Sequence, residues 1–499
     1  MISPRSEDSL DIDVNSLPGH TAAINSMPLN SKERSYVVNL DNISGPVHLA
    51  GIGGIGMSAL ARLLLAQGKK VSGSDKQESE ITNELKALGA DIHIGHEAKN
   101  LESAGALVVS TAIVDGNPEL EEAKRRGLPI WHRSDMLAYL ARNEKLIAIT
   151  GTHGKTTTTA MVGQVLIKAG LDPSIVVGGI FEHIGSNARH GAGGYFVAES
   201  DESDGTHVRC HPYISVITNI EPDHLENYPG GFDEILASMS QFLSNTEAFA
   251  IVCTDDSGVR TLLDKPCKTR IVTYGSFAGE TTPDYAFENL PGFGMNVFKQ
   301  GKKLGQVTMR VPGAHNKSNA VVAIVCAMEL GADFESVKAA LAEFGGVDRR
   351  FQRVGEVGGI LVIDDYAHHP TEVSALLAAA REFLRVERGG KGRVVCLFQP
   401  HQPGRLRDLW KEFTVAFNEA DLVLLTDIYV ARGGAIAGID SATFAKAVKN
   451  PNTHYLPGPV STLAEKLLDF IKPDDIVLTV GAGDVTRVGP ELVTLLSRQ

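Results

Sequence analysis

Short apolar runs alternate with stretches of helical periodicity along most of this chain. The first group begins with the apolar run Val47–Ala50, followed by a glycine-rich turn, a helical pattern over 57–67 and a second short run over 69–72. A strand, a helix and a second strand in this order predict a parallel βαβ unit. Two further strands are predicted over 106–110 and 130–131. The pattern therefore indicates a Rossmann-like N-terminal domain.

The same alternation returns twice further along the chain. A second group contains four apolar runs separated by helical patterns, over 147–150, 195–198, 214–218 and 250–253. A third group contains four more runs, over 360–364, 393–398, 422–426 and 476–480. Between these groups, the glycine-dotted span 281–309 predicts a small antiparallel excursion. The predicted fold class is α/β, with a central parallel sheet between two Rossmann-like domains.

The domain boundaries follow from breaks in this pattern. A polar linker lies near residue 143, and the chain leaves a helix at Gly345. We therefore expect domains at 45–143, 144–344 and 345–499. Three domains of ordinary size account well for a chain of 499 residues. Residues 1–44 are rich in Ser, Asn, Asp and Pro and have no signal-peptide core, so they predict a disordered N-terminal tail.

Composition and charge exclude some classes of protein. Hydrophobic residues make up 43% of the chain, and no apolar run approaches the roughly 20 residues needed to cross a bilayer, so we expect no integral membrane association. A net charge of −13 argues against nucleic-acid binding, which needs a basic face. The five cysteines are scattered and odd in number, which favours buried, reduced thiols and a cytoplasmic location. Whether the protein is a monomer or a dimer is left open.

The strand that ends at Thr150 runs directly into a short glycine-bracketed loop. Backbone N–H groups at such a loop, together with the N-terminus of the following helix, bind phosphate oxygens, and a lysine can reach the terminal phosphates. A glycine turn that merely links a strand to a helix is the alternative. The joint presence of strand, loop, Lys-Thr pair and helix favours ATP with Mg²⁺ as the ligand. The expected ATP contacts are Gly151, Thr152, His153, Gly154, Lys155, Thr156 and Thr157.

A second glycine loop, Gly51 to Gly56, follows the first predicted strand. Its GxGxxG spacing suits a pyrophosphate at a helix N-terminus, and the later Asp75 suits a ribose hydroxyl. The pattern alone does not distinguish NAD from a UDP-sugar, because both carry the same pyrophosphate. Gly53, Gly54, Ile55 and Gly56 are the expected backbone contacts.

Acidic and imidazole side chains follow two strands of the central group. Glu199 begins an acidic turn directly after a strand, and Asp223 and His224 follow the next strand. A solvated turn explains one or two of the four acidic residues between 199 and 204, but their crowding is easier to understand beside Mg²⁺. We expect Thr156, Glu199 and His224 to hold the metal.

Two further polar segments open helices. Asn316 and Asn319 lie one turn apart at the start of a helix predicted over 319–329, where capping explains one amide and a nucleotide contact the other. In the third domain, Asp365 and two adjacent histidines leave a strand just before Pro370, which suits a first helical turn. Nearby arginines, of which one or two are expected to act, supply charge for anionic ligands.

Five ordered segments together resemble the Mur ligase family. They are GIGGIGMSALA from Gly51, TGTHGKTTT from Thr150, NIEPDH from Asn219, HNKSNA from His315 and DDYAHHPTE from Asp364. The resemblance covers about residues 45 to 495. It implies one domain for a UDP-sugar, one for ATP and one that closes over both.

Within that family, the resemblance implies an ATP-dependent ligase that joins L-alanine to the lactyl carboxylate of UDP-N-acetylmuramate through an acyl phosphate, in peptidoglycan synthesis. It implies catalytic roles for Lys155, Glu199, His224, Arg350, Asp365 and His369, and substrate contacts for Asn187 and His368. A murein tripeptide recycling ligase acting on the same UDP-sugar is the nearest alternative. More distant ones are a folyl-polyglutamate ligase, a nicotinamide-dependent oxidoreductase and a non-catalytic nucleotide sensor.

Overall fold

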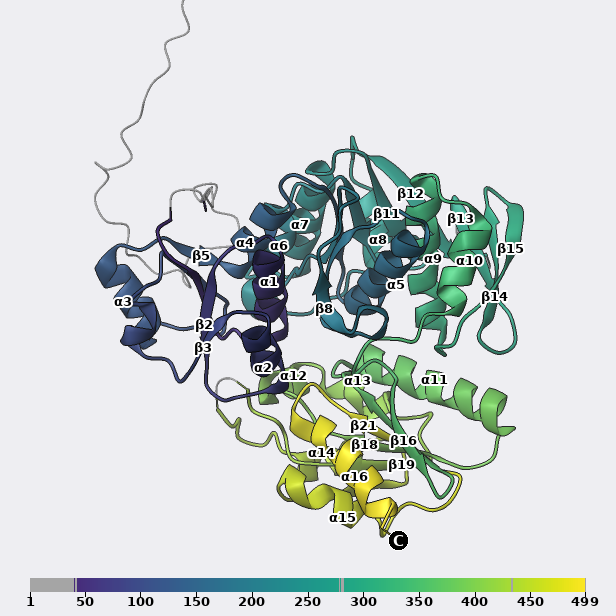
Figure 1. Cartoon of the computed structure of the whole chain (residues 1–499). Helices are drawn as coiled ribbons and strands as arrows, with labels where there is room; N and C mark the ends of the chain where they lie inside the picture. Colours follow the sequence, from purple (N-terminus) through teal and green to yellow (C-terminus); the bar gives the residue numbers. More distant parts are fainter. Residues whose placement is uncertain (1–39, 41–42, 278, 280–281, 432–433, 499) are drawn as a thin grey trace, which may run out of the picture.

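The computed structural model describes residues 40, 43–277, 279, 282–431 and 434–498. Three sheets organise this part of the chain, and helices flank them (Figure 1). The predicted tail at 1–44 lies almost entirely outside the described residues. Among the described residues, no helix combines the length and apolar character that a membrane span requires.

The first sheet contains five parallel strands in the order β3-β2-β1-β4-β5. The strands are β1 (Val47–Ala50), β2 (Val71–Asp75), β3 (Asp91–Ile94), β4 (Ala106–Val109) and β5 (Ile130–His132). Its helices are α1 (Ile55–Ala66), α2 (Glu80–Ala87), α3 (Pro118–Arg126) and α4 (Arg133–Ala141). This is the predicted Rossmann-like arrangement, with the glycine loop between β1 and α1 at the central strand.

The central sheet has ten strands in the order β15-β14-β13-β12-β11-β10-β6-β9-β7-β8. The strands are β6 (Lys145–Thr150), β7 (Ser174–Phe181), β8 (Ser186–Arg189), β9 (Tyr195–Glu199), β10 (Ile214–Ile217), β11 (Phe249–Cys253), β12 (Arg270–Ser276), β13 (Tyr285–Asn289), β14 (Gly294–Lys299) and β15 (Lys302–Thr308). The antiparallel pairing predicted over 281–309 is present, but it extends the main sheet, because β13 pairs in parallel with β12. Residue 281 itself lies outside the described residues.

The helices of the central domain are α5 (Lys155–Lys168), α6 (Thr206–Arg209), α7 (Phe232–Ser244), α8 (Ser257–Leu263), α9 (Ala314–Glu329) and α10 (Phe334–Ala342). The expected start of α9 at Asn319 was wrong, since the helix begins at Ala314. Gly313 precedes it with φ 101°, a conformation that glycine adopts readily, so the turn occurs before the polar segment and not within it.

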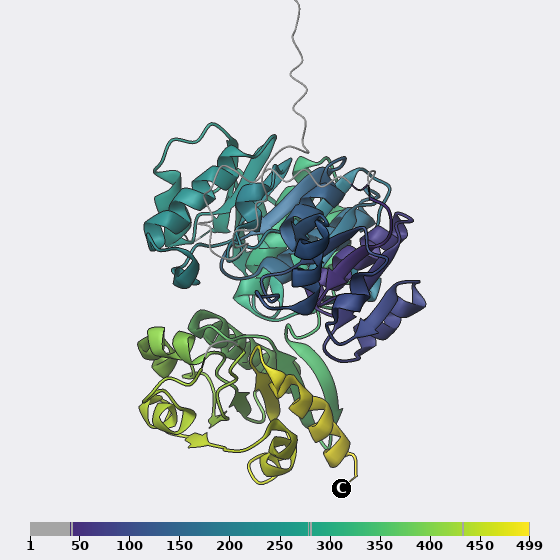
Figure 2. The same ribbon diagram turned by 90° about the vertical axis from the view of Figure 1, so that its left-hand side faces the viewer.

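The third sheet has six strands in the order β16-β17-β21-β18-β19-β20, all parallel except β16. The strands are β16 (Gln352–Val357), β17 (Ile360–Asp365), β18 (Val394–Phe398), β19 (Leu422–Leu425), β20 (Thr453–Tyr455) and β21 (Ile476–Val480). Its helices are α11 (Pro370–Arg388), α12 (Pro403–Asp408), α13 (Trp410–Val415), α14 (Ser441–Ala447), α15 (Leu463–Leu467) and α16 (Val488–Leu496). In both ribbon views the C-terminal domain lies below the other two (Figures 1 and 2).

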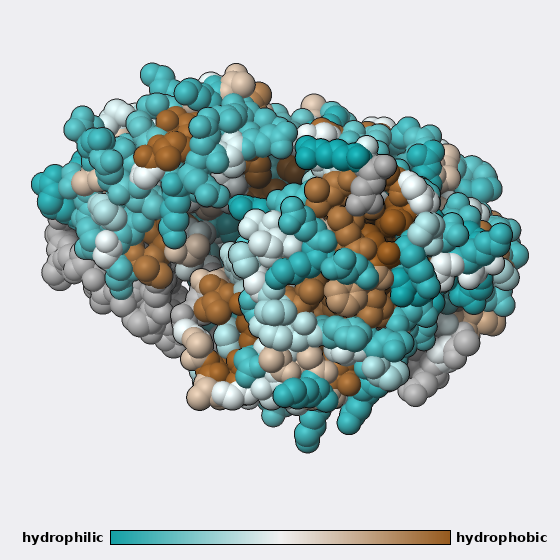
Figure 3. Space-filling view, turned by 90° about the horizontal axis from the view of Figure 1, so that it is seen from below, coloured by the Kyte–Doolittle hydropathy of each residue, from teal (hydrophilic) through white to brown (hydrophobic). Residues whose placement is uncertain are grey.

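The three domains share their cores unequally. One hydrophobic cluster runs from the first sheet into the central domain, joining Leu60 and Met136 to Phe196 and Met239. The two clusters of the C-terminal domain contain a single central-domain side chain, Phe293. Hydrophobic residues show as patches among hydrophilic ones on the face seen from below (Figure 3). Of the five cysteines, Cys267 is exposed, contrary to expectation.

Candidate active site

The phosphate loop joins β6 to α5, as the sequence predicts. Gly151 and Gly154 have φ values of 130° and 83°, which residues other than glycine rarely adopt. A β-carbon on Gly151 would also collide with the Thr218 hydroxyl. The end of β10 holds the loop in shape: His153 N–H donates to Asn219 Oδ1 at 2.8 Å, and the Thr218 hydroxyl donates to His153 O at 2.7 Å. The N-terminus of α5 is thus open to an anion.

Lys155 lies at the start of α5, where its side chain is 17% exposed, and it pairs with Glu202. Its Nζ donates to both Glu202 oxygens, at 2.9 and 3.0 Å, and to the carbonyl of Gly151 at 2.6 Å. Burial opposes the charged form, but the Glu202 carboxylate outweighs it and raises the pKa of Lys155. The ammonium is therefore charged and held beside the loop, where a phosphate would meet it.

The acidic turn after β9 is mostly packed. Glu202 is 5% exposed, and Glu199, Asp201 and Asp204 are half-buried, so none of the four is the fully solvated side chain that a solvated turn would present. Arg133 of the first domain donates to Asp204 at 2.5 Å, and Lys155 neutralises Glu202. The turn therefore connects the first domain to the phosphate loop through two ion pairs.

Thr156 and Glu199 form an oxygen pair at the start of α5. The Thr156 hydroxyl donates to Glu199 Oε2 at 3.2 Å, and the N–H of Gly178 donates to Oε1. Burial raises the pKa of Glu199, against the charges of Lys155 and Arg350. Hydroxyl and carboxylate oxygens are the donors that Mg²⁺ prefers, so this pair fits the ion. His224 has φ 54°, and its ring lies 3.6 Å from Asp223 Oδ2.

Asn316 and Asn319 are both buried near the phosphate loop. Asn316 lies inside α9, two residues after its start, so its side chain does not cap the helix. Its Nδ2 instead donates to the carbonyl of Pro312 at 2.7 Å. The expectation that capping explains one asparagine was therefore wrong. A β-carbon on Gly154 would lie 2.8 Å from Asn319 Oδ1, so this amide packs directly on the loop.

The first glycine loop is shaped by Asp75. Its Oδ2 accepts from Gly53 N–H at 2.9 Å and its Oδ1 from Lys76 N–H at 2.7 Å. Gly54 precedes α1 and makes no side-chain cap, so the helix N-terminus is open. Asp75 thus stabilises the loop itself, in addition to any ribose contact.

Asn187 lies at the junction of the first two domains and is fully buried. Its Nδ2 donates to Ile55 O at 2.6 Å and to Ser58 Oγ at 2.8 Å, and its Oδ1 accepts from Arg62 Nε at 3.1 Å. All of its hydrogen bonds go to α1, and its amide does not reach the surface. In this structure Asn187 therefore positions the helix that carries the glycine loop, and the sugar contact stays a prediction.

Asp365 organises the entry to the C-terminal domain. Its two oxygens accept from Phe351 N–H at 2.7 Å and Ala367 N–H at 2.8 Å, and burial, opposed by Arg350, raises its pKa to about 6. Arg349 and Phe351 both have positive φ, and the Arg350 guanidinium lies over the Tyr366 ring at 5.0 Å. Asp365 therefore fixes the turn that presents Arg350 toward the site.

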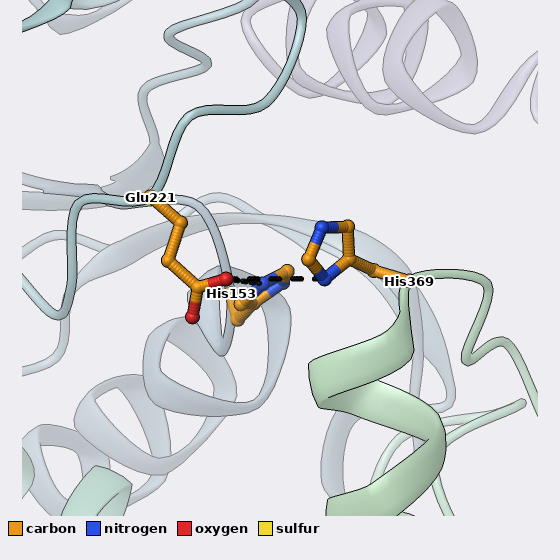
Figure 4. A group of neighbouring side chains, drawn as sticks. All are labelled: His153, Glu221 and His369. Atoms are coloured by element: carbon orange, nitrogen blue, oxygen red, sulfur yellow. Dashed lines mark ion pairs between the residues drawn. The ribbon is translucent and has the colours of Figure 1, made fainter. Parts of the chain in front are cut away.

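Four side chains meet where the phosphate loop faces the start of α11, and Figure 4 shows three of them, His153, Glu221 and His369. His153 Nδ1 lies 3.1 Å from Glu372 Oε1, and its Nε2 lies 3.5 Å from Glu221 Oε2. The rings of His153 and His369 are 4.7 Å apart. Burial opposes charge on His153, but the two carboxylates raise its pKa to about 9; burial and the charge of His153 lower the pKa of His369 to about 4. Thus His153 carries the proton.

His369 and His368 differ, as expected for adjacent histidines. His369 caps α11, accepting from Thr371 N–H at 3.4 Å, while His368 lies 3.1 Å from Glu372 Oε2. Burial opposes ionisation of Glu372, yet His368 and His153 hold its pKa well below the usual range. Glu372 was missed by sequence reasoning, although its place three residues after a cap is a recognisable capping-box signal.

Two glycine loops at helix N-termini, in adjoining α/β domains, with a third domain against the phosphate loop, are typical of a protein that binds two phosphorylated ligands. Family models match three stretches: "Mur ligase family, catalytic domain" over 46–145, "Mur ligase middle domain" over 149–327, and "Mur ligase, glutamate ligase domain" over 349–483. The chain belongs to the Mur ligase family.

Individual relatives span nearly the whole chain. A UDP-N-acetylmuramate–L-alanine ligase of Geotalea daltonii is 43% identical over 458 residues, covering 90% of this chain and 98% of the relative. That of Myxococcus xanthus is 43% identical over 463 residues, covering 90% and 95%. The crystal structure of a UDP-N-acetylmuramate-alanine ligase from Thermotoga maritima, 31% identical, superimposes with a TM-score of 0.78 over 91% of this chain and 99% of that one.

Proposed function

We propose that this protein is an ATP-dependent ligase that joins L-alanine to the lactyl carboxylate of UDP-N-acetylmuramate. The observation that carries the proposal is the 43% identity, over 90% of the chain, to relatives that bear this activity in their names. The geometry supports it, because the two glycine loops accommodate two phosphorylated substrates at the same time.

The chemistry requires activation of the acid, since a carboxylate does not react with an amine until one oxygen becomes a leaving group. A carboxylate oxygen takes the γ-phosphoryl group of ATP, which releases ADP and forms an acyl phosphate. The alanine nitrogen then attacks the acyl carbon, phosphate departs with the former carboxylate oxygen, and the nitrogen loses a proton. An amide results.

The chain's own residues supply charge and position for these steps. Lys155 and Arg350 stabilise the negative charge of the transferring phosphoryl group, and Asn319, packed on the loop with Asn316 nearby, holds the nucleotide. The glycine loop from Gly53 to Gly56 receives the UDP pyrophosphate at the uncapped N-terminus of α1, with the N–H groups of Ile55 and Gly56 as donors, because Asp75 occupies that of Gly53. Mg²⁺, when bound by Thr156, Glu199 and His224, would neutralise phosphate charge. His369 and His368, at the start of α11, complete the site from the third domain.

Phosphate release tests this function. Purified protein should release phosphate from ATP only when UDP-N-acetylmuramate and L-alanine are both present. We predict that Lys155→Ala lowers the rate by about 1,000-fold or more, because it removes a charge from the phosphoryl group. Lys338→Ala, which removes an exposed lysine on α10, is the control and should change nothing.

Two outcomes would contradict the proposal. A fully active Lys155→Ala protein would refute the role of the loop. A substrate panel in which a murein tripeptide replaces L-alanine as the preferred acceptor would assign the chain to the recycling reaction instead, with the same loop and the same sugar nucleotide.

A further inference from the structure

One group of side chains at the junction of the central and C-terminal domains has the composition of a transition-metal site. Nε2 of His153, Oε2 of Glu221 and Nδ1 of His369 all lie within 4.8 Å of one another. His153 comes from the phosphate loop, Glu221 follows β10, and His369 caps α11. Figure 4 shows the three side chains converging from these separate segments.

The spacing is near that of bound ligands. Around a tetrahedral ion with bonds of about 2.0–2.1 Å, neighbouring ligand atoms lie about 3.4 Å apart. Glu221 Oε2 lies 3.5 Å from His153 Nε2 and 3.9 Å from His369 Nδ1. Small side-chain rotations therefore close the set around one ion.

His153 is also oriented as a ligand. Its Nδ1 lies 3.1 Å from Glu372 Oε1, while its buried Nε2 faces Glu221 Oε2 at 3.5 Å without meeting hydrogen-bond geometry, so an entering ion takes the place of the proton on this nitrogen. A carboxylate on the far nitrogen is the usual support of a metal-bound imidazole, since it fixes the tautomer and the ring. The competing contacts are modest: His369 Nδ1 accepts one long bond, 3.4 Å, from Thr371 N–H, and Glu221 Oε2 accepts from Thr371 Oγ1.

We propose that His153, Glu221 and His369 form a binding site for a divalent transition metal such as Zn²⁺ or Co²⁺, separate from the Mg²⁺ pair at Thr156 and Glu199. Two imidazoles and one carboxylate suit these ions, whereas Mg²⁺ prefers oxygen ligands. Because His369 belongs to the C-terminal domain and the other two ligands to the central domain, the ion cross-links the two domains.

Cobalt binding tests the proposal without any substrate. The full-length protein, freed of metal with a chelator and kept in excess Mg²⁺, is titrated with Co²⁺ and followed by visible absorption. One Co²⁺ per chain should bind, with the intense bands of a tetrahedral site. Glu221→Gln and His369→Asn should each weaken binding by at least about 100-fold, and Glu372→Gln by about 10- to 100-fold through the supporting carboxylate.

A matched control and a second readout guard against misfolding. His454→Asn removes an exposed histidine of the same domain and should bind Co²⁺ as the parent protein does. Co²⁺ should also slow proteolysis of the segment 343–351 between the two domains, in the parent but not in His369→Asn. Wild-type affinity in both Glu221→Gln and His369→Asn, absence of tetrahedral bands in the parent, or thiolate charge-transfer bands from Cys267 would each overturn the proposal.

Discussion

The two interdomain junctions of this molecule are built differently. The junction of the first and central domains is a continuous hydrophobic cluster, and Asn187 is sealed within it against α1. The junction of the central and C-terminal domains is mostly polar: His153 meets Glu372, Thr371 donates to Glu221, and Lys317 pairs with Glu382. Apolar burial fixes relative position, whereas partly hydrated ion pairs exchange with water at little cost. We infer that the first junction is rigid and that the second opens and closes.

This difference matches the requirements of the reaction. The two glycine loops must keep a constant separation, so that the carboxylate of one substrate stays in line with the phosphate of the other. The third domain has to leave for substrates to enter and products to depart. The contact between His153 and Glu372 breaks and re-forms in that movement, and His153 belongs to the phosphate loop.

The largest expected effect is at the rigid junction. Asn187→Ala leaves the carbonyl of Ile55, Ser58 Oγ and Arg62 Nε without their buried partner, which we expect to destabilise the protein by about 3 kcal/mol. Thermal and denaturant unfolding measure this. Asn296→Ala, which removes an amide paired with Glu288 on β13, is the control and should cost less. Equal stability of the Asn187→Ala protein and the parent would show that the first junction does not depend on this amide.

A smaller effect is expected at the polar junction. It should change the rate of catalysis and leave the stability of the fold unchanged. Glu372→Gln removes the carboxylate that faces His153 across the domains, and we predict a fall in kcat of about tenfold with little change in thermal midpoint. Glu335→Gln, on the exposed face of α10, serves as the control. An unchanged kcat would mean that closure does not use this contact.

The pH dependence of the polar junction follows from the two histidine shifts. His153 has its pKa raised to about 9, so its contribution to closure is complete below the ordinary value of about 6.5 and is lost as pH rises through 9. His369 has its pKa lowered to about 4, so its contribution is lost as pH falls below 6.5. Closure should therefore be strongest near pH 6.5, weaken as pH rises toward 9, and weaken as pH falls toward 4.

NMR titration of the His153 ring, assigned with a His153→Gln sample, measures the first shift directly. In the Glu372→Gln protein the pKa of His153 should fall from about 9 toward 6.5, because one of its two carboxylates is gone. An unchanged titration would contradict the assigned cause.

The smallest effect is that of salt. Raising the ionic strength from about 0.05 to 0.5 M should increase proteolysis of the segment 343–351 about two- to threefold, since salt weakens the polar junction's partly buried ion pairs modestly. Cleavage near residue 143, beside the apolar junction, should not change. Equal sensitivity of the two segments would remove the distinction between the junctions.

The sequence was sufficient for what depends on local patterns. Apolar runs predicted β1, β6 and β21, and the glycine spacing located both loops, because these features are encoded within a few neighbouring residues. The strands β7 and β8 were missed, since paired glycines interrupt the apolar run of β7 at 178–179 and β8 is a short polar segment.

Partners distant in the chain were beyond reach of such patterns. No pattern singled out Glu202 among the four acidic residues as the counter-ion of Lys155, and Glu372 meets His153 across 219 positions. The contacts of Asn187 with α1 were likewise not predicted, because they depend on how α1 packs against β8. These contacts arise only when the domains assemble.

The measurement that tests the central claim most directly follows a labelled oxygen. UDP-N-acetylmuramate carrying ¹⁸O in its lactyl carboxylate is incubated with ATP, L-alanine and the protein, and the released phosphate is analysed by mass. Activation by phosphoryl transfer predicts that each released phosphate carries one oxygen from the carboxylate. The labelled fraction of the phosphate should therefore equal the ¹⁸O enrichment of the starting carboxylate. Phosphate that contains no label would contradict the mechanism proposed for this chain.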